Sequence, residues 1–126
     1  MRHKSIRRRL TFTGACTAAL VGVVVACGGS PNKTAPPQGL TVDISIANGQ
    51  VTPTNAALQA QVHQPITLHV TSDAADELHV HSVPDHKFEV AVAPNQTFQF
   101  SVDVPGKVDV ELHHLKRTVA TIQVTA

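Results

Sequence analysis

The stretch LTVDISIANG, residues 40–49, alternates apolar and polar side chains and ends in a turn dipeptide. Val42, Ile44 and Ile46 occupy every second position, so a β-strand would place all three on one face. Asn-Gly at positions 48–49 is a strong signal for a tight turn between two strands. This stretch therefore predicts a strand with one buried face, followed by a turn.

The same alternation continues to the C-terminus, and a weaker strand is predicted over residues 57–62. The later apolar sets are Ile66, Leu68 and Val70; Leu78 and Val80; Phe88, Val90 and Val92; Phe98, Phe100 and Val102; Val108, Val110 and Leu112; and Ala120, Ile122 and Val124. Proline, asparagine and glycine separate these sets, and none of them has a helical period. Seven or eight strands at roughly ten-residue spacing predict one all-β domain over residues 40–126, an antiparallel β-sandwich.

The N-terminal 26 residues differ from this domain in composition. Five of the ten Lys and Arg residues lie in the first nine positions, and an uncharged, mostly apolar run follows over residues 10–26. A basic start, an apolar run and a small residue before a cleavage site are typical of an export signal. The run is short for a spanning helix, which needs ~20 apolar residues. The three arginines at positions 7–9 leave the general and twin-arginine export routes open.

The end of this run, Val-Val-Ala-Cys at positions 24–27, is similar to a bacterial lipobox, in which the cysteine receives a lipid and becomes the new N-terminus. We expect residues 1–26 to be a lipoprotein signal peptide, Cys27 to be lipidated, and residues 27–39 to be a linker rich in Gly, Pro and polar residues. The expected location is the extracytoplasmic face of the cell membrane, which the chain contacts through its lipid anchor. An ordinary signal peptide and an uncleaved anchor helix are the alternatives.

Removal of the signal peptide would change the charge of the protein. Five basic residues would remain against nine acidic ones, a net charge of −4 with neutral histidines. This balance argues against nucleic acid as a partner. Both cysteines and the only methionine lie at or before position 27. The folded domain is therefore expected to have no disulfide and no sulfur ligand.

Histidines and acidic residues share the polar positions of two predicted strands. Over residues 77–81, His79 and His81 alternate with Leu and Val and so lie on the same face. Over residues 108–113, Glu111 and His113 share a face in the same way. If the two strands are neighbours, these four side chains converge, and imidazole nitrogens with a carboxylate are suitable ligands for copper or zinc.

The alternative for these residues is a solvated face without a metal, because polar residues alternate on any strand with one exposed side. His114 would point away from His113 if the strand continues, so it is the second choice for a ligand. His63, His69 and His86 lack comparable neighbours in the sequence, and we expect them to be surface residues.

Residues 76–81, Asp-Glu-Leu-His-Val-His, and residues 105–113, Pro-Gly-Lys-Val-Asp-Val-Glu-Leu-His, together resemble the cupredoxin-like domains of bacterial exported proteins. The resemblance covers residues 40–126 and implies a Greek-key β-sandwich, in which a histidine of a middle strand meets ligands near the final hairpin. Blue-copper members supply a cysteine, a histidine and usually a methionine from that hairpin. Here Glu111 stands where the cysteine is expected, so a blue-copper site is not expected. Ser-Val-Pro-Asp at 82–85 also replaces the usual Gly-Tyr-Asp.

Three functional hypotheses follow. The favoured one is a membrane-tethered lipoprotein that binds copper or zinc at His79, His81 and His113, with Glu111 as a ligand or an outer partner. Such a domain would exchange metal with a donor or acceptor protein. The second is a metal-free β-sandwich that serves as an interaction or structural module on the cell surface. The third, an enzyme, is not expected, because the sequence shows no evident general acid or base and no substrate-pocket pattern.

Overall fold

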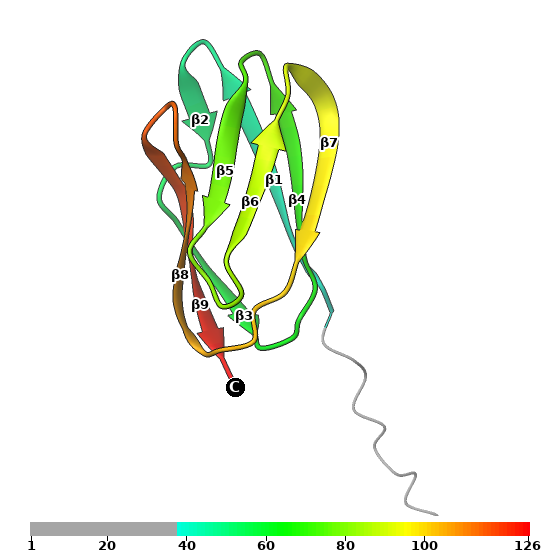
Figure 1. Cartoon of the computed structure of the whole chain (residues 1–126), viewed down its shortest axis with the longest axis vertical. Coiled ribbons are helices and arrows are strands. Elements are labelled where there is room, and N and C mark those ends of the chain that lie inside the picture. The colour runs from blue at the N-terminus through cyan, green and yellow to red at the C-terminus, as the bar shows by residue number, and fades with distance from the viewer. Residues whose placement is uncertain (1–37) are drawn as a thin grey trace, which may run out of the picture. The chain divides into compact units, whose positions relative to one another are not determined.

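The computed structural model describes residues 38–126, which form nine β-strands and no helix (Figure 1). The strands are β1 (Leu40–Ala47), β2 (Gln50–Thr52), β3 (Ala56–Gln61), β4 (Ile66–Ser72), β5 (Asp76–Val80), β6 (His86–Val90), β7 (Ala93–Phe100), β8 (Gly106–Leu112) and β9 (Arg117–Thr125). The eight stretches with apolar alternation all form strands. The ninth strand, β2, was not predicted. It is short and pairs with the end of β1 across the turn at positions 48–49.

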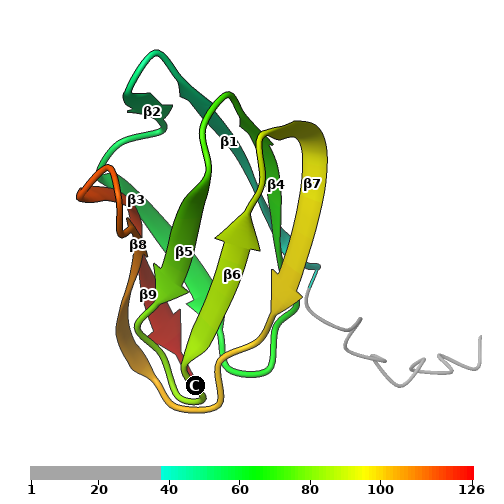
Figure 2. The ribbon, with the colours of Figure 1, turned by 45° about the horizontal axis from the view of Figure 1, so that its top comes forward.

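The nine strands form two sheets that pack face to face (Figure 2). The strand orders are β2-β1-β4-β7 in the four-stranded sheet and β3-β9-β8-β5-β6 in the five-stranded sheet. The expected all-β sandwich is thus confirmed. The expectation of a wholly antiparallel arrangement was wrong for two pairs, because β1 pairs with β4, and β3 with β9, in parallel. An alternation of period two does not distinguish parallel from antiparallel neighbours.

The turn at positions 48–49 forms as expected. Ala47 pairs with Gln50 across it, and both turn residues have positive φ, 53° for Asn48 and 72° for Gly49. Asparagine and glycine tolerate this left-handed conformation better than other residues, and it matches the twist of the two flanking strands.

The core lies between the sheets and is almost entirely aliphatic. Its fully buried side chains include Ile46, Ile66, Leu68, Val70, Leu78, Val80, Val110, Leu112 and Ile122. Burying one such side chain contributes about 1.5–3 kcal/mol relative to leaving it exposed. Val92, predicted to be inward, is instead 64% exposed, because β6 ends at Val90 and the chain then bends toward the other sheet.

The signal peptide over residues 1–26, the lipidation at Cys27 and most of the linker lie outside the described residues. Within residues 38–126, no helix is long and apolar enough to cross a membrane.

Candidate metal centre

The four residues predicted to form the site lie together on the outer face of the five-stranded sheet. Strands β5 and β8 are antiparallel neighbours, and His79 pairs directly with Glu111 in their register. Leu78 and Val80 on either side of His79 are fully buried, so the alternation of the strand turns the imidazole away from the core. The two strands are therefore neighbours, as the predicted metal site required.

His79 is the central side chain of this cluster and the least exposed of its members, with 14% of its side chain accessible. Its Nε2 lies 2.7 Å from Oδ1 of Asp85, and its Nδ1 lies 3.0 Å from Nε2 of His113. Both nitrogens of one ring are therefore in contact with groups that can bind a proton or a cation.

His81 follows the last residue of β5 and lies over His79, with ring centroids 4.0 Å apart. Its backbone N–H donates to the carbonyl of Asp109 at 2.9 Å, so His81 continues the pairing with β8 although the strand has ended. Its Nε2 lies 3.0 Å from Oε2 of Glu111. The side chains of His81 and Glu111 are 46% and 39% exposed, which leaves this side of the cluster open to solvent.

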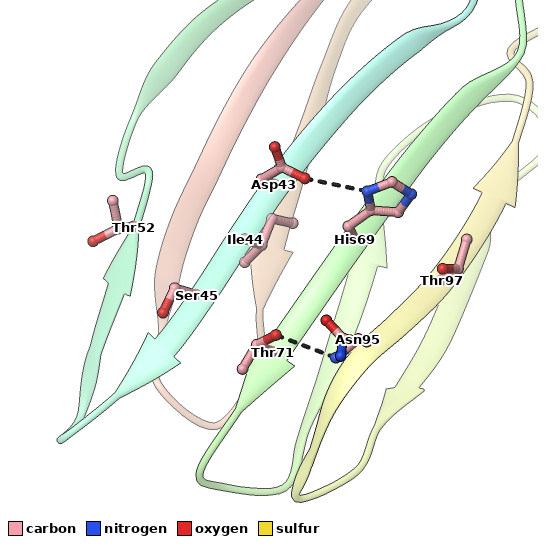
Figure 3. A pocket seen from close by; sticks show the side chains of 8 residues that line it. All are labelled: Asp43, Ile44, Ser45, Thr52, His69, Thr71, Asn95 and Thr97. Atoms are coloured by element: carbon pink, nitrogen blue, oxygen red, sulfur yellow. Dashed lines mark hydrogen bonds and ion pairs between the residues drawn. The ribbon is translucent and has the colours of Figure 1, made fainter.

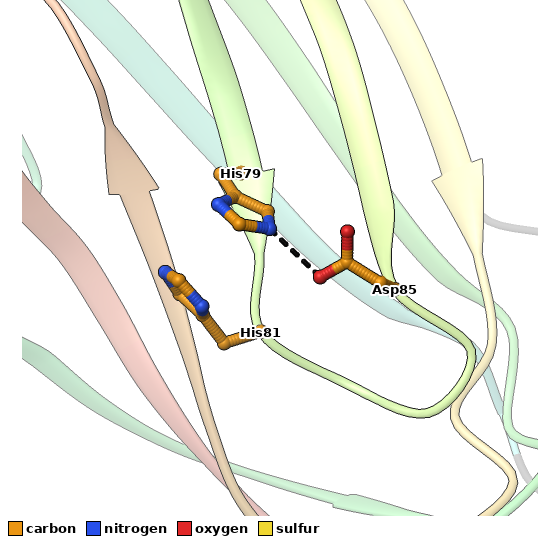
Figure 4. A group of neighbouring side chains, drawn as sticks. All are labelled: His79, His81 and Asp85. Carbon is orange, nitrogen blue, oxygen red and sulfur yellow. Dashed lines mark hydrogen bonds and ion pairs between the residues drawn. The ribbon is translucent and has the colours of Figure 1, made fainter.

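Asp85 belongs to the cluster but was not predicted from the sequence. One nitrogen from each of His79 and His81 and one oxygen from Asp85 all lie within 4.8 Å of one another. Figure 4 shows the three side chains grouped around the end of β5, with Asp85 pointing toward His79. The register of β5 with β6 pairs Val80 with His86, so one step outward brings His81 opposite Asp85. A hairpin predicted across residues 81–86 would have revealed this carboxylate.

The loop that carries His81 and Asp85 is held by hydrogen bonds. The backbone N–H of Ser82 donates to the carbonyl of Val80 at 2.9 Å, and its hydroxyl donates to the carbonyl of Pro84 at 2.6 Å. The N–H of Asp103, in the connection between β7 and β8, donates to the carbonyl of Val83 at 2.8 Å. The loop is therefore held both by bonds within itself and by a bond to the connection between β7 and β8.

His113 lies at the end of β8 and contacts a carboxylate of β5. Its Nδ1 is 2.9 Å from Oε1 of Glu77, and its backbone N–H donates to the carbonyl of the same residue at 3.0 Å. Lys87 on β6 approaches the same oxygen of Glu77, with 4.0 Å between Nζ and Oε1. His113 therefore contacts His79 and Glu77, whereas Glu111 contacts His81.

The electrostatics of the cluster favour an ionised Asp85. The hydrogen bond with His79 is the main cause that lowers the pKa of Asp85 below its ordinary value of 3.8. Desolvation opposes this effect and raises the pKa, and the nearby charges of His79, Lys87 and His81 lower it further. The carboxylate is therefore available to a cation at neutral pH.

The remaining histidines do not join the cluster. His114, the second choice from the sequence, is 72% exposed, and its Nδ1 lies 3.3 Å from the carbonyl of Ala75. His63 and His69 form exposed pairs with Asp103 and Asp43, each at 3.2 Å. Within residues 38–126, His79, His81 and Asp85 are the one group of three whose ligand atoms converge.

A separate hollow lies on the other sheet. It is a groove of about 640 Å³ on the outer face of the four-stranded sheet (Figure 3). Its lining residues are Asp43, Ile44, Ser45, Thr52, His69, Thr71, Asn95 and Thr97. A smaller hollow of about 280 Å³ lies beside the histidine cluster, next to Glu111 and His113.

No protein-family model and no curated protein matches this sequence. Among solved structures, the chain is similar to a purple cupredoxin from Nitrosopumilus maritimus, with 14% identity, a TM-score of 0.48, and coverage of 68% of this chain and 99% of that one. It is similar to a Cu(I) methionine-to-alanine mutant of amicyanin, with 15% identity, a TM-score of 0.47, and coverage of 68% and 81%. A proline-to-glycine amicyanin mutant in its reduced Cu(I) form gives 14% identity, a TM-score of 0.47, and coverage of 72% and 86%.

Proposed function

We propose that this protein is an extracytoplasmic, membrane-tethered lipoprotein whose β-sandwich binds copper or zinc on its outer face, at a site centred on His79 and His81. The proposal of a metal site is supported by one observation above all: two imidazoles and the carboxylate of Asp85 converge within 4.8 Å. The lipid anchor at Cys27 is supported by the sequence alone. We assign the domain a role in binding the metal and exchanging it with a donor or acceptor protein.

The spacing of the donor atoms fits a transition metal. Metal–nitrogen and metal–oxygen bonds of about 2.0–2.2 Å place neighbouring ligand atoms roughly 3 Å apart. The contact between Nε2 of His79 and Oδ1 of Asp85, at 2.7 Å, is close to this separation. Small rotations of exposed side chains would complete the coordination.

The types of donor atom favour divalent ions. Residues 38–126 contain no cysteine and no methionine, so the ligands are nitrogen and oxygen atoms. Such ligands suit Zn²⁺ and Cu²⁺ better than Cu⁺, which prefers sulfur. The same residues carry nine Asp and Glu against four Lys and Arg, a balance that raises the local concentration of cations.

The open position of the site supports exchange of the metal. His81 and Asp85 are 46% and 54% exposed, so a ligand from another protein could approach an ion bound between them. A buried, fully enclosed structural site would not allow such an approach.

The second candidate, a metal-free interaction module, is favoured by a different observation. Val83 and Val104 are 57% and 49% exposed, and they lie on two loops joined by the hydrogen bond between Asp103 and Val83. Exposed apolar residues of this kind are typical of contact surfaces when they are contiguous and rimmed by polar residues.

Calorimetric titration with Zn²⁺ and Cu²⁺ tests the metal site. We would use the full-length protein in detergent, a variant with His79→Ala and His81→Ala, and a matched control with His63→Ala and His69→Ala. We expect one ion to bind per chain, no binding at the site in the first variant, and unchanged binding in the control. Equal and weak binding by all three proteins would leave the interaction module as the better proposal.

A further inference from the structure

We infer that the metal binds on the Nε2 side of His79, together with His81 and Asp85, and that His113 and Glu111 orient the two histidines without binding the ion. This inference rests on the proposed metal site and states which atoms form it. It removes two of the residues that the sequence favoured as ligands and gives each a positioning role.

When an ion lies beside Asp85, the hydrogen on each ring follows from Glu77, the carboxylate at the other end of the chain of contacts. An ionised carboxylate only accepts hydrogen bonds, so Glu77 requires a hydrogen on Nδ1 of His113, 2.9 Å away. A neutral imidazole carries one hydrogen, and Nε2 of His113 is therefore an acceptor. It lies 3.0 Å from His79, whose Nδ1–H consequently donates to it.

This assignment leaves a lone pair on Nε2 of His79. Oδ1 of Asp85 is 2.7 Å from that nitrogen. Two acceptors at this distance repel each other unless a proton or a metal ion lies between them. The position between Nε2 and Oδ1 is therefore compatible with the surrounding hydrogen bonds, and it is the one where a third ligand, from His81, also converges.

A metal on the Nδ1 side of His79 is the competing arrangement. There the ion would lie between His79 and His113, and Asp85 would become an outer partner of His79. Among the described residues, however, no third donor converges on this pair, whereas His81 and Asp85 both converge on His79. Three protein ligands hold an ion far better than two, and the Nε2 side is therefore favoured.

His81 is oriented in an equivalent way. Its Nε2 faces Oε2 of Glu111 at 3.0 Å, and donation from Nε2–H to that carboxylate leaves Nδ1 free. Histidines that bind metals usually donate their other ring hydrogen to such an outer group, and loss of that group weakens metal binding by about 10–100-fold. The backbone holds these partners, because His79 pairs with Glu111 and the amide of His113 donates to Glu77.

The test is long-range ¹H–¹⁵N NMR of the zinc-loaded, full-length protein in detergent, which shows for each ring the nitrogen that binds the metal. We expect zinc on Nε2 of His79 and on Nδ1 of His81, with both nitrogens of His113 unbound. Zinc on a nitrogen of His113, or on Nδ1 of His79, would overturn the inference while leaving the proposed metal site intact. A protein that binds no zinc at all would instead refute the proposed function on which the inference rests.

Variants provide a second readout that a purely structural role would not give. We expect His113→Asn and Glu111→Gln each to weaken copper binding by about 10–100-fold. The electron paramagnetic resonance spectrum of the bound Cu²⁺ should still show two coordinated imidazoles in each variant. Asp85→Asn should keep the two imidazoles but lose one oxygen ligand. A third imidazole in the native protein that disappears in His113→Asn would contradict the inference.

Discussion

Asp76 is the buried carboxylate on which the geometry around His113 depends, and we predict that Asp76→Ala destabilises the protein. The side chain is 2% exposed, and its two oxygens accept three backbone hydrogen bonds. The donors are the N–H groups of Glu77 at 2.7 Å, His114 at 2.8 Å and Leu115 at 3.0 Å. Asp76 thus ties the turn after β8 to the start of β5.

The expected size follows from these contacts. A hydrogen bond to a charged acceptor contributes about 1.5–3 kcal/mol, and the three together set an upper bound of about 9 kcal/mol. Water can reach the exposed backbone of His114 in the variant, and the substitution also relieves the cost of burying a charge. We therefore expect the free energy of unfolding to fall by about 3 kcal/mol.

Urea unfolding of a protein of residues 38–126, followed by circular dichroism, measures this loss. Asp43→Ala is the matched control, because Asp43 has an 87% exposed side chain and one contact, with His69. Exposed pairs of this kind contribute about 0–1 kcal/mol. If Asp76→Ala cost no more than this control, with the urea dependence unchanged, the reasoning on the turn would be refuted.

Three further predictions concern the core, the metal and Asp85. Leu78→Ala removes a fully buried side chain and should cost about 3 kcal/mol in urea unfolding, whereas Val92→Ala at a 64% exposed position should change stability by less than about 0.5 kcal/mol. Chelation of the bound metal should leave the circular dichroism spectrum unchanged and lower the melting temperature, because only the native state binds the ion; unfolding by the chelator would show instead that the ion is structural. Asp85 has a lowered pKa, so the stability it contributes is present above pH 3.8 and lost as the pH falls through its folded pKa. A ¹³C NMR titration should therefore give a midpoint below 3.8 for Asp85, and His79→Ala should raise that midpoint; a midpoint at 3.8 in both proteins would contradict the contact.

The strands were predictable because each has one buried face. In β1 and β8 the inward side chains recur at every second position, and the core residues Val42, Ile44, Val108 and Val110 are those that the alternation indicates. The pairing of strands was not predictable in the same way. The parallel partners β1 and β4 show the same alternation as antiparallel strands, and the path of the chain through β2 and β3 determines their direction.

The site was predictable in part for the same reason. Alternation placed His79 and Glu111 outward, and the resemblance to cupredoxin-like domains suggested that their strands are neighbours, as the register confirms. The contacts of Asp85 and Glu77 could not be predicted from the sequence. Asp85 lies in a loop, where no period applies, and the contact of Glu77 with His113 depends on the stagger between two strands. Which of these residues bind a metal stays a prediction.

The core and the histidine cluster use alternate residues of β5. Leu78 and Val80 stabilise the sandwich through their buried side chains, whereas His79 between them contacts residues of the outer face. Substitution of the outer residues therefore changes the ligands with little effect on the core, since exposed positions tolerate replacement within about 0.5 kcal/mol. His79 contacts both His81 and His113, all three contact carboxylates of the outer face, and none of the three belongs to the core. A cation bound as proposed would therefore lie on the outer face of the five-stranded sheet, without contact with the buried side chains of Leu78 and Val80.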